Sequence, residues 1–255
     1  MSRPAPVALS VAALSALELR LAARRGENLL VMVVVPIAVL AFFSNLGIGP
    51  LGTGPSAVAA LLPGTVAIAI IASSFVSLGI ATAYERSYGV MKRLGGAPID
   101  RWVVIAAKIL VVLVIEVGQV VLVLVVATAI LGWEPPANDL VRRLVLLGIG
   151  LGLGTLAFGG LGLLVAGSLR AEATLALANA FFLGFLMLGG TILPLDHLPE
   201  PLRSLGVLLP SSALTDLLRS SFSASAGGEL LRPLVVLLAW GVGASGLAAW
   251  TFRWE

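Results

Sequence analysis

Long uncharged stretches alternate with short charged ones along the chain, which is the pattern of a protein that crosses a membrane several times. A helix needs about 20 consecutive apolar residues to cross the hydrocarbon core of a bilayer. The uncharged run from Asn28 to Tyr84 is long enough for two such helices, and a cluster of glycines and prolines divides it. We therefore expect six transmembrane helices, at 29–47, 63–83, 102–131, 144–169, 173–193 and 232–252.

The composition also indicates a membrane protein. Of the 255 residues, 59% are hydrophobic and 11% are charged, whereas a soluble domain is about 45–50% apolar and about 25% charged. A soluble protein of this composition would have too few polar side chains to cover its surface. We therefore expect an all-α polytopic membrane protein with one transmembrane domain over residues 1–255.

Basic residues are distributed unequally between the two sides of the predicted helices. Eleven of the 16 lysines and arginines fall on the side that also carries both termini. Short cytoplasmic loops carry an excess of basic residues, so this pattern places both termini in the cytoplasm. The segment 7–25 has a short apolar stripe and is expected to form a helix that lies in the membrane interface.

Two connections carry more structure than ordinary loops. The cytoplasmic segment 84–98 is predicted to form a short helix that ends at Gly95 and Gly96, and its mixture of apolar and basic residues favours contact with another protein. The extracellular segment 194–222 alternates prolines with apolar helical turns. Because it is too apolar to lie in water, we expect two short helices that re-enter the outer leaflet and are covered by protein.

Catalytic, metal and cofactor sites are not expected on this chain. It has no cysteine and a single histidine, His197, which cannot form a metal site alone. It also lacks the Gly-x-x-x-x-Gly-Lys-Ser/Thr loop that binds nucleotide phosphates and the Gly-x-Ser-x-Gly turn of serine hydrolases. Any ATP-driven activity therefore requires a partner protein, and the chain itself is not expected to be an enzyme.

Glu116 and Lys108 are charged residues inside the predicted spans. A charge at the centre of a bilayer costs about 2.5–3.5 kcal/mol on insertion scales. Glu116 is therefore either a site for proton or cation coupling, or a carboxyl group that is kept neutral or hydrogen-bonded to a neighbour such as Gln119 or a serine of an adjacent span. Lys108 lies a turn or two inside the cytoplasmic end, so we expect its side chain to extend to the lipid phosphates.

Phenylalanines and glycines of the spans each have a structural interpretation as well as a functional one. Glycines of the fourth span favour close packing of a neighbouring helix. Phenylalanines either face lipid or line a path for an apolar substrate. The candidates for such a path are Phe42, Phe43, Phe75, Phe181, Phe182 and Phe185.

The order of these features resembles the type-2 ATP-binding-cassette exporter permeases, which export drugs and polysaccharides. The resemblance covers nearly the whole chain, from the interfacial segment through the six spans, and it rests on two sets of residues. The segment between spans two and three contributes Glu85, Arg86, Gly89, Lys92, Arg93, Leu94 and Pro98, and the hairpin between spans five and six contributes Pro194, Pro199, Pro210 and Arg219.

The resemblance implies a permease subunit that pairs with a second copy or a close relative and with two cytosolic ATPase subunits. Residues 85–94 would then be a coupling helix seated in a cleft of the ATPase, with its basic side chains contacting acidic groups there. ATP and magnesium would bind to the ATPase, and the hairpin 194–222 would gate the outer mouth of a path lined by the first, second and fifth spans. The implied location is a bacterial inner membrane, with lipids as further partners and no nucleic acid.

Three functions are compatible with this sequence. The first is the exporter permease, for which an aromatic content of only 6% favours a lipophilic drug-like or lipid-like cargo over a polysaccharide or glycolipid. The second is a proton-coupled secondary transporter that uses Glu116. The third is a membrane subunit that anchors or regulates an ATPase without moving a substrate. A homodimer and a heterodimer are both compatible with one sequence.

Overall fold

The computed structural model describes residues 6–24, 26–46, 52–96, 100–191, 195, 199–223 and 229–251. These residues form helices and no strands. In chain order the elements are α1 (Val7–Arg24), α2 (Gly26–Leu46), α3 (Pro55–Ile71), the π-helical segment η2 (Ala72–Ser77), α4 (Leu78–Ser87), α5 (Val90–Gly95), α6 (Arg101–Ala129), α7 (Leu140–Ser168), α8 (Ala171–Leu188), α9 (Glu200–Leu208), α10 (Pro210–Phe222) and α11 (Leu231–Thr251).

Five helices of the described part are long and apolar enough to cross a membrane: the continuous helix Pro55–Ser87, and α6, α7, α8 and α11. Inside a bilayer the backbone must satisfy its own hydrogen bonds, so uninterrupted apolar runs fold as helices. The apolar part of α2, Met32–Leu46, is shorter. Each of the six predicted spans therefore coincides with a helix, and five of these helices have the length of a membrane span.

The second predicted span is interrupted by a π-helical turn. Helices α3 and α4 are joined through η2 without a break in the helix, and the buried side chains of Ser73, Ser74 and Phe75 lie on this turn. Such turns occur mostly inside α-helices and often at functional sites. This turn brings two hydroxyl groups into the apolar interior, where they need hydrogen-bond partners.

Helix α7 is the centre of the bundle, where it packs against α11, α10, α4 and α6. Its glycines allow these neighbours to approach closely, as the sequence predicts. A Cβ atom at Gly162 would lie 2.7 Å from the carbonyl oxygen of Phe75, and one at Gly160 would lie 2.6 Å from the hydroxyl oxygen of Ser245. A Cβ atom at Gly152 would meet nothing within 4 Å, so close packing is restricted to part of the glycine-rich helix.

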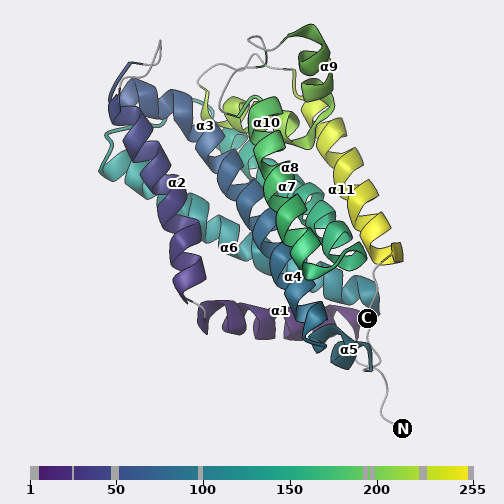
Figure 1. Cartoon of the computed structure of the whole chain (residues 1–255). Helices are drawn as coiled ribbons and strands as arrows, with labels where there is room; N and C mark the ends of the chain where they lie inside the picture. Colours follow the sequence, from purple (N-terminus) through teal and green to yellow (C-terminus); the bar gives the residue numbers. More distant parts are fainter. Residues whose placement is uncertain are drawn as a thin grey trace.

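The two ends of the bundle are covered by short or transverse helices (Figure 1). At one end α1 lies across the bundle, next to α5, and packs against α6. At the opposite end lie α9 and α10, of which α10 is almost fully buried against α7, α3 and α11. The transverse position of α1 fits the predicted interfacial helix, and α9 and α10 lie within the predicted hairpin segment.

Candidate functional site

Helix α5 is held against the bundle by the buried side chain of Met91. Helix α4 ends at Ser87, and Gly89 then takes a positive φ of 73° that lets the chain turn before α5 begins. Met91 is fully buried in an apolar cluster with Leu14 of α1 and Val104 of α6. The sequence predicts one short helix here, whereas the structure has the end of α4, a turn, and α5 as three parts.

The opposite side of this segment faces outward. Tyr88 is 75% exposed, and the side chains of Val90, Lys92 and Arg93 are exposed as well. An aromatic ring, an aliphatic side chain and two cations therefore form one surface at the end of the bundle that carries α1. We call these four residues the α5 surface. The side chain of Leu94 and residue Pro98 lie outside the described residues.

Glu85 and Arg86 point into the protein rather than out from the α5 surface. The guanidinium group of Arg86 donates a hydrogen bond to the carbonyl oxygen of Leu169, at the end of α7. Lys108 Nζ of α6 lies 2.7 Å from Glu85 Oε2 and 2.9 Å from Glu18 Oε1 of α1. These contacts tie the ends of α4, α7, α6 and α1 together.

The prediction that Lys108 extends to the lipid phosphates is wrong. Its side chain is only 3% exposed, because Glu18 and Glu85 provide counter-charges inside the protein. An ammonium group with two carboxylate partners has no need to reach the headgroups, whereas an unpaired one would. We call Glu18, Lys108 and Glu85 the inner ion triad.

Glu116 is fully buried in the middle of α6, between α7 and a serine of the adjacent span η2, so one of the two neighbours that the sequence suggests is present and Gln119 is not among its partners. The hydroxyl group of Thr155 donates to Glu116 Oε2, while Ser74 lies beside the carboxyl group and donates to Ile70 O at 2.5 Å. The other oxygen, Oε1, has no hydrogen-bond partner among the described residues. The structure therefore favours a hydrogen-bonded interior carboxyl group, and a coupling role for it stays a prediction.

Gln119, one turn further along α6 than Glu116, forms hydrogen bonds to two other elements, α2 and η2. Proline has no N–H group, so Pro36 in α2 leaves the carbonyl oxygen four residues earlier, that of Met32, without its helical partner. Gln119 Nε2 donates to this Met32 oxygen at 2.5 Å, and Gln119 Oε1 accepts a hydrogen bond of 3.1 Å from Ser73. One amide side chain thus joins the proline site of α2 to the π-helical turn of η2.

The six predicted phenylalanines fall into separate groups within one subunit. Phe185 of α8 packs edge-to-face on Phe75, with ring centroids 5.5 Å apart, and stacks on Phe181. Phe42 and Phe43 form a separate, exposed pair on α2. Phe182 is half-buried beside the core. The exposed rings are equally suited to lipid or to a partner, so the substrate path stays a prediction.

The predicted outer gate is built around α10. Pro199 precedes α9 and Pro210 begins α10, whereas Pro194 lies outside the described residues. Arg219 of α10 donates to Gly190 O at 2.6 Å, which fixes α10 to the end of α8. Asp216 lies 2.5 Å from Arg232 of α11, and burial raises the pKa of this carboxyl group against the opposing effect of Arg232 and Arg219.

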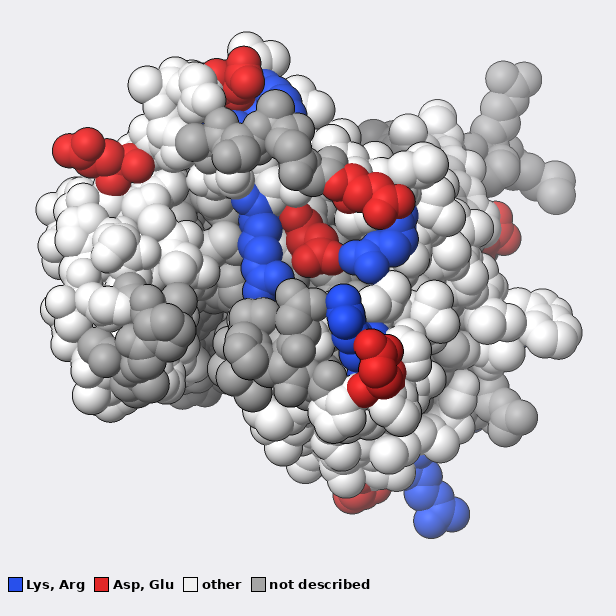
Figure 2. Space-filling model, turned by 90° about the horizontal axis from the view of Figure 1, so that it is seen from above, with Lys and Arg blue, Asp and Glu red and all other residues white. Residues whose placement is uncertain are grey.

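The end of the bundle that carries α9 and α10 is hollowed. In Figure 2, which looks onto the end that carries α9 and α10, acidic and basic side chains lie next to one another around the middle of this face, with uncharged residues around them. An open hollow of about 860 Å³ there is lined by Pro63, Trp133, Phe222 and Arg219, among others. Arg143, which the sequence analysis did not single out, is buried and donates to Ser221 O at 3.0 Å, joining α7 to α10.

Most of the chain matches a known protein family. The family model of the ABC-2 type transporter matches residues 10–223, which include most of α1, the α5 surface and α10. The chain belongs to the ABC-2 type transporter family. A relative named "Putative transport permease YvfS", from Bacillus subtilis (strain 168), is 24% identical over 197 residues, which make up 76% of this chain and 78% of the relative. ABC-2 permeases normally work with an ABC ATPase partner.

Proposed function

We propose that this chain is the transmembrane subunit of an ATP-driven exporter in a bacterial inner membrane. In this proposal α2 and the five longer helices make six spans, both termini lie in the cytoplasm, and two permease subunits associate with two ATPase subunits. The observation that carries the proposal is the α5 surface, whose outward side chains stand on a helix anchored from behind by Met91. Through Met91, such a helix transmits a force applied at the α5 surface directly to α1 and α6.

The inner ion triad supports the same proposal. A movement of α5 reaches α4 through the turn at Gly89, and Glu85 at the end of α4 is tied to α6 through Lys108. The ATPase therefore has a mechanical connection to two spans at once. Coupled movement of packed helices between two arrangements is the general form of such switching. ATP and magnesium would be held by the partner, and this chain would supply no catalytic group.

The test is to remove the two cations of the α5 surface, with Lys92→Ala and Arg93→Ala in one variant. Arg86 is left intact because it bonds to Leu169 O inside the protein. The matched control is Arg20→Ala with Arg24→Ala, which removes two exposed cations from α1 at the same end. We expect the α5 variant to lose ATPase binding and ATP-driven transport in reconstituted vesicles, and the control to retain both. Unchanged transport in the α5 variant would refute the coupling role.

For the cargo we propose a lipophilic drug-like or lipid-like molecule, supported by the low aromatic content and by the largely apolar lining of the inner cavity described below. A polysaccharide or glycolipid cargo is the alternative within the same family. A proton-coupled transporter that uses Glu116 predicts transport driven by a pH gradient without ATPase, abolished by Glu116→Gln. The full burial of Glu116 speaks against that mechanism, because a coupling carboxyl group has to exchange protons with water.

A further inference from the structure

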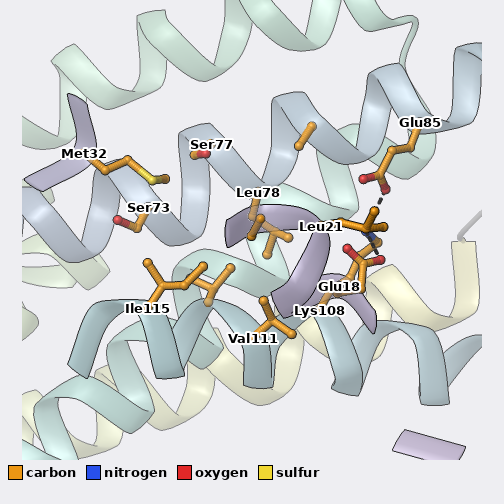
Figure 3. A pocket seen from close by; sticks show the side chains of 13 residues that line it. Glu18, Leu21, Met32, Ser73, Ser77, Leu78, Glu85, Lys108, Val111 and Ile115 are labelled. Carbon is orange, nitrogen blue, oxygen red and sulfur yellow. Dashed lines mark hydrogen bonds and ion pairs between the residues drawn. The ribbon is translucent and has the colours of Figure 1, made fainter. Parts of the chain in front are cut away.

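A cavity of about 130 Å³ lies between α1, α2, α6 and the helix formed by η2 and α4 (Figure 3). Its two ends differ in chemistry. Glu18, Glu85 and Lys108 lie at one end, while Met32 and Ser73 lie at the other. The walls between the two ends are mostly apolar and include Leu78, Val111 and Ile115.

The cavity follows from the way α2 packs. Helix α2 packs mainly against α3, with smaller contacts to α6 and α1. Its attachment to the η2 region runs through Gln119, which binds the backbone oxygen freed by Pro36. Leu21 and Ala22 of α1 line the space that remains beside α4. A volume close to 150 Å³ accommodates a benzene-sized molecule, so this cavity has the size for a small apolar group.

The charges at the inner end do not balance. Two carboxylates face one ammonium group, so the inner ion triad carries one excess negative charge. Lys108 contacts Oε1 of Glu18 and Oε2 of Glu85, and the remaining oxygen of each carboxylate has no partner among the described residues. Both side chains are largely buried, at 19% and 21% exposed. Charges in such surroundings interact strongly with a nearby cation.

We propose that this cavity binds an amphipathic ammonium compound. The ammonium group would join the unpartnered oxygens of Glu18 and Glu85, and a short apolar body would lie along Leu78, Val111 and Ile115. Binding of the amine does not depend on the proposed function. The interpretation of the amine as cargo does rest on it: if the chain is an exporter permease, the cavity defines the cargo class as lipophilic amines. A free hydrophobic amine and the headgroup of an aminophospholipid share this chemistry.

The test compares three probes of matched shape: 4-phenylbutylamine, which is a cation, 4-phenylbutanol, which is neutral, and 4-phenylbutyrate, which is an anion. Binding to the full-length permease in dodecyl maltoside is measured by titration calorimetry, with protein-free micelles subtracted. We expect the amine to bind at least tenfold more tightly than the alcohol and the carboxylate not to bind. Equal binding of the three probes, or no binding of the amine, would overturn the proposal.

Two variants locate the binding. Glu18→Gln removes the excess negative charge and leaves the pair of Glu85 and Lys108 intact, so we expect at least a tenfold loss of amine affinity. Glu172→Gln makes the same change on the exposed first turn of α8 and should leave the affinity unchanged. Ala81→Leu fills the cavity without altering a charge and should also abolish binding. Amine binding that survives both Glu18→Gln and Ala81→Leu places the amine elsewhere and contradicts the proposal.

Further measurements distinguish a free amine from an aminophospholipid as the occupant, and distinguish this proposal from the proposed function. If phosphatidylethanolamine added to the micelles displaces the amine while phosphatidylglycerol does not, the aminophospholipid is the natural occupant; if neither displaces it, the occupant is a free amine. The titration uses neither ATPase nor nucleotide. Amine binding without ATPase coupling would therefore uphold the cavity and refute the exporter, and coupling without amine binding would do the reverse.

Discussion

The contact between α7 and the π-helical turn can be tested with a single added methyl group. In Gly162→Ala the new Cβ would lie 2.7 Å from Phe75 O, 3.0 Å from Ser74 O and 3.3 Å from Phe75 Cα. All three neighbours are backbone atoms, so the two helices must separate by several tenths of an ångström. The same separation would disturb the hydroxyl group of Ser74 beside Glu116. Gly152→Ala adds the same methyl group on the same helix where nothing lies within 4 Å.

The expected magnitude follows from these contacts. Overpacking a tightly packed site costs about 1–3 kcal/mol, whereas replacing glycine by alanine inside a helix is favourable by about 0.5–1 kcal/mol where space allows. For a chain of this size, 1 kcal/mol corresponds to about 2–4 °C in the midpoint of unfolding. Because the helix gain is common to both variants, we expect Gly162→Ala to unfold roughly 2–12 °C below Gly152→Ala, and Gly152→Ala to unfold at or above wild type.

The assay is thermal unfolding of the two purified variants in the same detergent, followed by the loss of the monodisperse peak in size-exclusion chromatography. Heating rate and detergent are kept constant, because unfolding of such proteins is often irreversible and its midpoint then depends on the rate. If Gly162→Ala were as stable as Gly152→Ala, the close approach of α7 to η2 would be refuted.

The remaining predictions concern the polar contacts between spans. Gln119→Leu removes the hydrogen-bond partner of Met32 O and of Ser73, so we expect the free energy of unfolding to fall by about 1–3 kcal/mol, measured as a lower unfolding midpoint. The control Asn179→Leu should leave the midpoint unchanged, because the hydrogen bond of Asn179 lies within its own helix. Equal losses in the two variants would contradict the cross-helix role of Gln119. Lys108→Met should lower the free energy of unfolding by on the order of 3 kcal/mol, because it leaves two largely buried carboxylates without a counter-charge. Adding Glu18→Gln and Glu85→Gln should restore part of this loss. A triple variant no more stable than Lys108→Met would show that the uncompensated charge is not the cause.

The positions of the long apolar helices were predictable, because a bilayer leaves an apolar run little choice but a helix. The prediction 102–131 differs from α6, Arg101–Ala129, by only two residues at its C-terminal end. The predicted end of the short cytoplasmic helix at Gly95 also agrees with α5. Its start was not predicted, since α4 continues to Ser87 and only the positive φ of Gly89 marks the break.

Partners across the bundle were not predictable from spacing along the chain. Lys108 meets Glu18 and Glu85, which are 90 and 23 residues away, and its burial reversed the expectation that it extends to the lipid headgroups. Glu116 pairs with Thr155 of α7, although Gln119 is nearer in sequence. One signal was present in the sequence: a proline inside an apolar span requires a donor for the carbonyl oxygen that it frees, and Gln119 was an available amide.

The most direct test of the account is site-specific cross-linking from the α5 surface to the ATPase. Because the chain has no cysteine, Tyr88→Cys would give it one thiol on that surface, and Leu205→Cys would give it one on the exposed face of α9 at the opposite end. Each variant is expressed in its native cells, treated in membranes with a short thiol-to-amine cross-linker, and examined by mass spectrometry. We expect an ABC ATPase to be cross-linked through Tyr88→Cys and not through Leu205→Cys. If Tyr88→Cys gave no ATPase cross-link while the ATPase still copurified with the permease, α5 would not be its docking site.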